Sequence, residues 1–170
     1  MKYEIVIEHV YAEMEGSFDS FTFHLEEALG ITTPAKLQAL TASPASMVSY
    51  LNSTGDERDL ILFNILVQDD LTKNVNRKKI KQYQVGNPRI MLRMIENHPG
   101  AGLYIPIHIL VYEKQDGKVV VEYDLPSSSF AHFNSAEILY DSIALENKLT
   151  ELIRIADEES RQAPRDQPAR

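Results

Sequence analysis

Two neighbouring runs of alternating residues predict a β-hairpin between residues 103 and 126. In the first run one face is entirely apolar and consists of Leu103, Ile105, Ile107, Ile109 and Val111. The residues between them are also largely apolar, which is typical of a strand covered on both faces. In the second run the apolar face consists of Val119, Val121, Tyr123 and Leu125. These two strands are expected to form the centre of a sheet.

The length of the turn sets how the two strands pair. A two-residue loop would set apolar residues opposite polar ones, whereas a three-residue loop at 115–117 pairs Val111 with Val121. Gly117 then takes the left-handed position of a bulged turn, which glycine adopts without steric cost. The same register sets His108 opposite Asp124.

A cross-strand pair of His108 and Asp124 has two interpretations. The carboxylate would raise and orient the imidazole, which suits a general base or a ligand-binding pair. The alternative is an ordinary polar pair near the end of a sheet. Both interpretations stay open at this stage.

The rest of the pattern predicts one α+β domain over residues 1–156. We expect an antiparallel sheet of about five strands with helices mainly on one face. The further elements expected are a strand at 3–9, a helix at 17–30, a helical insertion at 32–56, a doubly covered strand at 60–67 and a long helix ending near 156. Residues 157–170 are polar and proline-containing, and they are expected to be a disordered tail.

A Gly-Asn-Pro corner at 86–88 offers a second candidate site. A helix beginning after Asn87 would present backbone N–H groups to an anion, with Arg89 in its first turn and the basic residues of 77–81 nearby. Against this, Pro88 lacks an N–H group and Asn87 can cap the helix itself. The alternative is therefore a structural corner beside a solvated basic strand.

The corner and the hairpin together resemble the domain of unknown function family 302. The resemblance rests on Val85-Gly86-Asn87-Pro88, Leu103-Tyr104-Ile105-Pro106, Val111-Tyr112-Glu113, Asp116-Gly117-Lys118 and Tyr123-Asp124-Leu125-Pro126. It implies a compact α+β domain that resembles the TATA-binding-protein-like fold and forms a dimer, and it implies no activity. The chain departs from the family pattern at residues 68–71, Gln-Asp-Asp-Leu, where the family often has Asp-His. Chemistry that depends on that histidine is in doubt here.

Composition excludes several classes of function. The net charge of −8 disfavours nucleic acid as a partner, and the absence of cysteine removes thiolate and disulfide chemistry. Apolar runs are too short for a membrane span, and the first residues lack the apolar core of a signal peptide, so we expect a soluble, cytoplasmic protein. The five histidines lack the spacing of a metal site, and no cofactor motif is present, so no metal and no cofactor are expected.

These observations favour a non-catalytic homodimeric module that binds a small anionic or amphipathic ligand. The candidate ligand-binding residues are Asn87, Arg89, Tyr104, His108 and Asp124. One alternative is a cofactor-independent enzyme in which His108 is the general base and Asp124 orients it. Another is a protein–protein interaction module, which would expose an apolar patch and lack a pocket.

Overall fold

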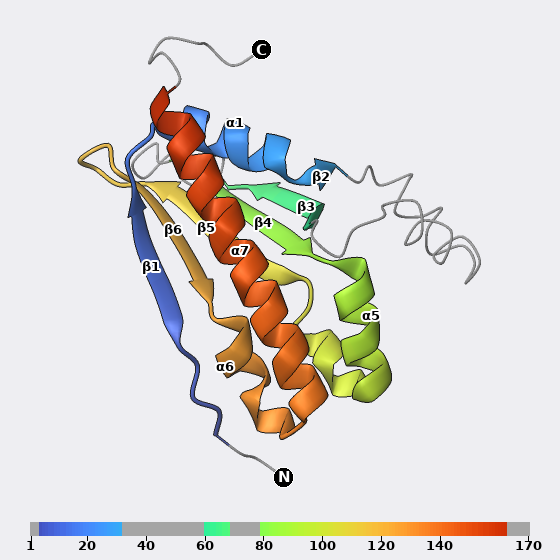
Figure 1. Ribbon diagram of the computed structural model, residues 1–170. Coiled ribbons are helices and arrows are strands. Elements are labelled where there is room, and N and C mark those ends of the chain that lie inside the picture. The colour runs from blue at the N-terminus through green and yellow to red at the C-terminus, as the bar shows by residue number, and fades with distance from the viewer. Residues whose placement is uncertain (1–3, 32–59, 69–78, 163–170) are drawn as a thin grey trace.

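The core of the protein is a six-stranded sheet in the order β1-β6-β5-β4-β3-β2. The computed structural model describes residues 4–31, 60–68 and 79–162 (Figure 1). Its strands are β1 (His9–Met14), β2 (Gly30–Ile31), β3 (Ile61–Val67), β4 (Ile80–Gly86), β5 (Ile107–Glu113) and β6 (Val119–Asp124). Its helices are α1 (Phe18–Ala28), α5 (Pro88–Asn97), α6 (Pro126–Phe130) and α7 (Ala136–Gln162), with short 3₁₀ helices η1 (Pro99–Leu103) and η2 (Ala131–Phe133). The expected helical insertion at 32–56 lies outside the described residues.

The α+β class is confirmed. Five strands pair antiparallel, and the two-residue β2 adds a parallel edge against β3. Helices α1 and α7 cross the same face of the sheet, as Figure 1 shows, so the expectation of helices mainly on one face is confirmed as well. The arrangement is compatible with the TATA-binding-protein-like fold.

The register predicted for the hairpin is also confirmed. Val111 lies opposite Val121, and Gly117 has a φ of 81°, the left-handed conformation that the bulged turn requires. The turn is closed by the Gly117 N–H, which donates to the Lys114 carbonyl at 3.0 Å. Face matching was therefore sufficient to set the pairing of these two strands.

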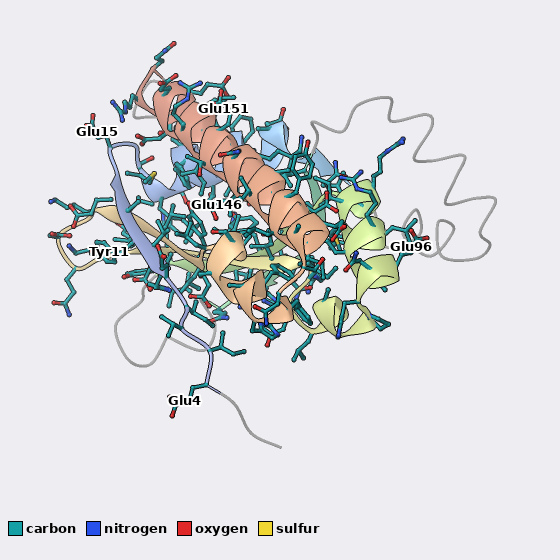
Figure 2. All side chains as sticks on the ribbon, turned by 60° about the horizontal axis from the view of Figure 1, so that its bottom comes forward. Glu4, Tyr11, Glu15, Glu96, Glu146 and Glu151 are labelled. Atoms are coloured by element: carbon teal, nitrogen blue, oxygen red, sulfur yellow. The ribbon has the colours of Figure 1, made fainter. Side chains whose placement is uncertain are left out.

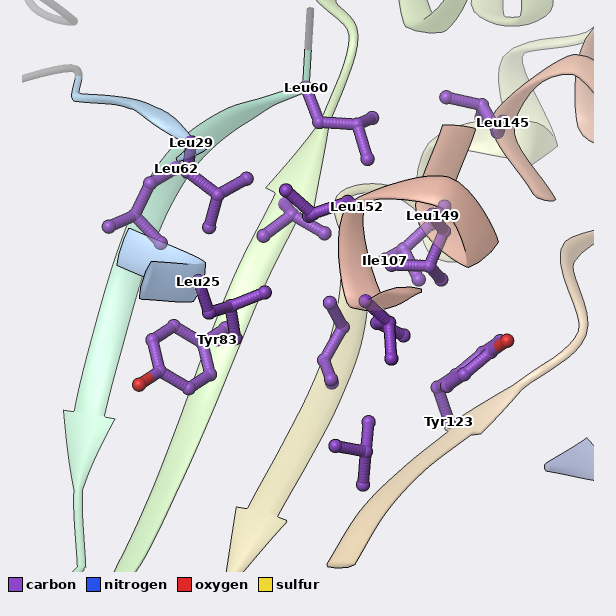
Figure 3. Packing of buried hydrophobic residues seen from close by; sticks show 14 of the residues in the cluster. Leu25, Leu29, Leu60, Leu62, Tyr83, Ile107, Tyr123, Leu145, Leu149 and Leu152 are labelled. Atoms are coloured by element: carbon purple, nitrogen blue, oxygen red, sulfur yellow. The ribbon is translucent and has the colours of Figure 1, made fainter. Parts of the chain in front are cut away.

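Apolar side chains on the helix-covered face of the sheet meet the inner stripe of α7 and α1. Ile109, Val111 and Val121 are fully buried there, together with Leu145 and Leu149 of α7. Polar residues such as Glu151 lie on the outer side of α7 (Figure 2). Figure 3 shows residues of α7 packed above β4, β5 and β6. These residues belong to one continuous apolar core, whose burial stabilises the domain.

The expectation that β5 is covered on both faces was wrong. Its burial alternates: Ile107, Ile109 and Val111 are buried, whereas His108 is exposed and Leu110 is half-buried. Among the described residues, α1 and α7 lie on one side of the sheet, and the other face, which carries His108 and Leu110, is called the open face. Leu110 and Tyr112 on that face are only half-buried, so an apolar sequence need not mean double coverage.

Two further strand predictions need correction. The first strand begins at His9 instead of ending there, because residues 9–14 pair with β6 and the described residues 4–8 are not part of a strand. Strand β3 is covered only at its start, and Leu66 and Val67 are 45% and 59% exposed. Strand β2 reaches only as far as Leu62, so the second half of β3 forms the edge of the sheet among the described strands.

The predicted tail was wrong over residues 157–162, which continue α7. The Asp157 carboxylate is buried and accepts a hydrogen bond from the Glu15 N–H at 2.9 Å. Ser160 packs so closely against Gly16 that a Cβ at that glycine would lie 2.0 Å from the serine Oγ. The polar composition of this segment reflects contacts with the turn before α1, which a sequence pattern does not reveal.

Candidate functional site

A small cavity of about 150 Å³ lies where β5 begins and β6 ends. Its lining combines apolar and polar side chains from η1 and the residue after it, β5, β6 and α6. These residues are Leu103, Tyr104, Ile107, His108, Asp124, Pro126, Ser129 and Phe130. The antiparallel hairpin brings the first residues of β5 beside the last residues of β6, and α6 follows at once and closes one wall. Three of the five residues nominated from the sequence, Tyr104, His108 and Asp124, therefore line one cavity.

His108 takes its hydrogen-bond partner from β4. Gln84 of β4 lies opposite His108 in the β4–β5 ladder, and its Nε2 atom lies 3.0 Å from His108 Nε2. An amide N–H group can only donate, so it is the Gln84 side chain that donates to the imidazole in this contact. The side chain is exposed, and Gln84 orients the ring without the help of a carboxylate.

Asp124 takes its hydrogen-bond partner from β1, and not from His108, which the hairpin register sets opposite it. Asp124 is opposite His9, and its Oδ1 atom lies 2.7 Å from His9 Nδ1. The hairpin register was right, but the sequence did not show that β1 would join β6 at this position. The carboxylate of Asp124 is therefore hydrogen-bonded to the imidazole of His9.

His9 belongs to a wider polar network on the open face of the sheet. Its Nε2 atom lies 3.2 Å from Glu122, which also accepts a hydrogen bond from the Tyr112 hydroxyl at 2.6 Å. The bonds from Asp124 and then Glu122 raise the pKa of His9 above its ordinary value of 6.5. The bond to Glu122 raises the pKa of Tyr112 to about 12. An imidazole that donates to two carboxylates is protonated, so the geometry favours a charged His9.

Tyr104 and Phe130, which line the cavity, belong to a cluster of aromatic rings that His132 and Phe133 extend behind it. The centroid of the Tyr104 ring lies 5.6 Å from Phe130, 5.2 Å from His132 and 6.0 Å from Phe133. His132 stacks on Phe133 at 4.0 Å, and its Nδ1 atom lies 3.0 Å from the Ser129 carbonyl, a distance at which an Nδ1–H would donate. Sequence patterns did not predict this cluster, whose only signal is the Phe-Ala-His-Phe run at 130–133.

Asn87 and Arg89 do not reach the cavity. Asn87 is 3% exposed, and its side-chain oxygen accepts from the backbone N–H groups of Arg89 and Ile90, each at 3.0 Å. With Pro88 lacking an N–H, the chain itself satisfies the donors that an anion would have used. The structural interpretation of the corner therefore fits this helix start better than an anion site does.

The described basic residues near this corner pair with carboxylates of α1. Lys79 contacts Asp19 at 2.5 Å, and Lys81 contacts Glu26 at 2.8 Å. Glu26 also accepts a hydrogen bond from the buried Tyr83 hydroxyl at 2.8 Å. These lysines thus join β4 to α1. Arg77 and Lys78 lie outside the described residues.

A second, wider hollow of about 710 Å³ lies between α5 and the start of α7. Arg93, Glu96, Glu137, Tyr140 and Asp141 line most of it. The Arg93 guanidinium is bonded to the buried Asp141 carboxylate at 2.6 Å, which joins the two helices. Because the Arg93–Asp141 ion pair of this hollow holds the two helices together, the hollow is a weaker candidate for a ligand site than the cavity at β5 and β6.

Comparison with known families agrees with the resemblance read from the corner and the hairpin. The family model "Domain of unknown function DUF302" matches residues 39–156. The chain belongs to this family. No curated protein matches the sequence. In the residues that the structure describes, no group of three or more histidine and acidic side chains is placed to hold a metal ion, and no helix is long and apolar enough to cross a membrane.

A solved structure of the same family shares the fold. The crystal structure of the uncharacterized conserved protein DUF302 from Bacillus stearothermophilus superposes with a TM-score of 0.62 at 12% sequence identity. The match covers 87% of this chain and 97% of that chain. At this identity the likeness establishes the arrangement of elements, and function must be argued from the side chains of this chain.

Proposed function

We propose that this DUF302 chain is a non-catalytic, homodimeric, cytoplasmic module that binds a small amphipathic ligand in the cavity between β5, β6 and α6. The observation that carries the proposal is the mixed lining of the cavity. Tyr104, Ile107 and Phe130 supply an apolar wall, whereas His108 and Asp124 supply polar groups at one side. Binding sites for small molecules commonly have this composition, an apolar pocket with a few converging polar groups.

The size of the cavity limits the ligand to a small group. An apolar protein cavity of about 150 Å³ accommodates a benzene ring. A ligand of one ring, or the end of a longer molecule, would therefore fit beside Tyr104 and Phe130. Edge-to-face contacts with these rings would favour an aromatic group.

The charge around the cavity selects the polar end of the ligand. Asp124 lines the cavity, and the carboxylate of Glu122 lies on the same open face and shares the His9 imidazole. A carboxylate at the wall repels an anion. The N–H groups of Arg89 and Ile90 in the first turn of α5 are already bonded to Asn87. The sequence predicts either an anionic or an amphipathic ligand. These charges favour an amphipathic ligand whose polar group is neutral or cationic.

The binding test uses single-ring probes that differ only in charge. We expect benzylamine and benzyl alcohol to bind the purified protein in ligand-observed NMR, and benzoate to bind more weakly. His108→Ala and Asp124→Asn should reduce binding of benzylamine at least several-fold without unfolding the domain. Tyr140→Ala on α7, which lies in the other hollow, is the matched control and should bind like the wild type. Equal binding by all four proteins would refute the assignment of the cavity.

The enzyme alternative receives less support from the geometry. A general base at His108 would need an orienting carboxylate, and Asp124 is engaged by His9 while Gln84 holds His108. Native mass spectrometry of the purified protein would find a carried ligand as excess mass. A turnover that follows the protonation of His108 would favour the enzyme instead.

A further inference from the structure

Strand β1 forms one edge of the sheet, and its outer side has no partner among the described strands. In the strand order it pairs with β6 only, and it runs along one margin of the sheet in Figure 1. The ladder with β6 is continuous from His9 to Met14, without a bulge, and β1 contains neither proline nor lysine. A bulge, proline and lysine are among the devices that protect an exposed edge, whose free N–H and C=O groups attract another strand.

The hydrogen bonds to β6 determine which backbone groups of β1 face outward. The Leu125 N–H donates to the Glu8 carbonyl at 2.8 Å, so Glu8 and Leu125 are a hydrogen-bonded pair. Such pairs alternate along an antiparallel ladder, so Val10, Ala12 and Met14 also bond to β6. The backbone groups of His9, Tyr11 and Glu13 therefore point away from the sheet.

This edge is arranged symmetrically about Tyr11. We propose that β1 pairs antiparallel with β1 of a second copy of this chain, with the two Tyr11 residues opposite each other across a two-fold axis. His9 of each copy then lies opposite Glu13 of the other. All the outward N–H and C=O groups of these three residues are satisfied in one register, because each opposed pair exchanges two hydrogen bonds.

Side chains on both faces of β1 fit the same register. On the open face the His9 imidazole, which contacts Asp124 and Glu122, would meet the Glu13 carboxylate of the other copy, which contacts Lys114 and Lys118. These two groups have complementary charge. On the helix-covered face Val10, which is only half-buried, would lie opposite Ala12 of the other copy. A shift of one residue would mix the polar and apolar faces, so the register is specified.

This interface gives a structural basis to the homodimer within the proposed function and adjoins its cavity, because Asp124 both lines the cavity and contacts His9. It does not require the cavity to bind a ligand. Dimerisation and binding can therefore fail separately, and the experiments below measure dimerisation alone.

The symmetry can be tested with a single thiol, because the chain contains no cysteine. Opposed residues of a hydrogen-bonded pair have Cα atoms about 5.5 Å apart, within the range that a disulfide can bridge. Tyr11→Cys should therefore form a covalent dimer under mild oxidation, seen as a doubled mass on a non-reducing gel. Tyr140→Cys is the control: Tyr140 is 73% exposed on α7 and should stay monomeric on the same gel.

A charge variant tests the interface without oxidation. The wild type should show twice the 19.3 kDa chain mass in native mass spectrometry and in light scattering. Tyr11→Lys places like charges opposite each other and should shift the protein to monomer, with at least a tenfold weaker dimer, whereas Tyr140→Lys should remain dimeric. Circular dichroism confirms that each variant is folded.

Two outcomes would overturn the proposal. A wild type that is monomeric at all concentrations, with a free thiol in the Tyr11→Cys variant, would leave β1 without a second copy as partner. A dimer that survives Tyr11→Lys, with no cross-link through Tyr11→Cys, would place the dimer contact elsewhere and would leave the ligand proposal untouched.

Discussion

The two faces of the sheet differ in what holds their side chains. On the covered face apolar residues such as Ile109 and Leu149 exclude water completely, and the position of each side chain follows from close packing. On the open face His9, Glu122, Asp124 and Tyr112 are held by hydrogen bonds in contact with solvent. The covered face therefore supplies the stability of the domain, and the open face carries groups that remain available to a ligand or a partner.

The sharpest test of this difference compares two neighbours in β5. Ile109 is fully buried and Leu110, on the open face, is half-buried. Ile109→Ala should lower the free energy of unfolding by about 2–5 kcal/mol, because it removes transfer energy and leaves a cavity. Leu110→Ala should cost clearly less, as judged from urea unfolding curves of both variants. Similar losses would mean that the open face is packed in solution, for example by another molecule.

The contact between the start of α1 and the end of α7 can be overpacked with one methyl group. Gly16→Ala would place a Cβ 2.0 Å from the Ser160 Oγ and 2.6 Å from its Cβ, so we expect a loss of about 1–3 kcal/mol. Gly102→Ala is the matched control, because its new Cβ would meet only Ile95 at 4.0 Å. Thermal unfolding should separate the two variants, and a neutral Gly16→Ala would show that the end of α7 moves away readily.

Asn87 distinguishes a structural corner from a binding residue. Asn87→Ala removes the cap of α5 and should destabilise the protein by about 1 kcal/mol, within a range of about 0.5–2. Binding of benzylamine should be unchanged in the folded variant, since Asn87 does not line the cavity. The reverse result, normal stability with lost binding, would restore the corner as a ligand site.

The smallest effect concerns His9 and depends on pH. Because its pKa is raised in the folded protein, its contribution to stability is present below the ordinary value of 6.5 and is lost as pH rises through the raised value. His9→Gln should therefore lower the melting temperature more at pH 5.5 than at pH 8.5, modestly in both cases because the group is exposed. NMR titration of the ring gives the pKa directly. An identical effect at both pH values would argue against a charged His9.

Local sequence patterns were sufficient to predict the structure wherever residues close in sequence are also in contact. The bulged turn at Gly117, the register of Val111 with Val121 and the cap at Asn87 all depend on residues within one hairpin or one helix turn. The family resemblance was read from the same local segments and is confirmed by the match over residues 39–156. Of the candidate site, Tyr104, His108 and Asp124 were found for this reason.

Contacts between segments that are distant in sequence could not be predicted from local patterns. Alternation along β5 does not reveal whether a helix layer covers one face or both, since half-exposed tyrosine and leucine satisfy either arrangement. The partner of Asp124 comes from β1, at the other end of the chain, and the extension of α7 depends on Glu15 and Gly16. Each of these contacts is decided by the strand order and by helix placement.

The sequence by itself determined the class of the domain, the hairpin, the helix start at Asn87 and three of the residues that line the cavity. Each of these follows from periodicity, turn chemistry or a short motif, which act over a few residues. The tertiary structure alone decided which imidazole meets Asp124, which face of the sheet stays open and which strand becomes the free edge. The physical reason is that antiparallel pairing and helix packing join residues more than a hundred positions apart.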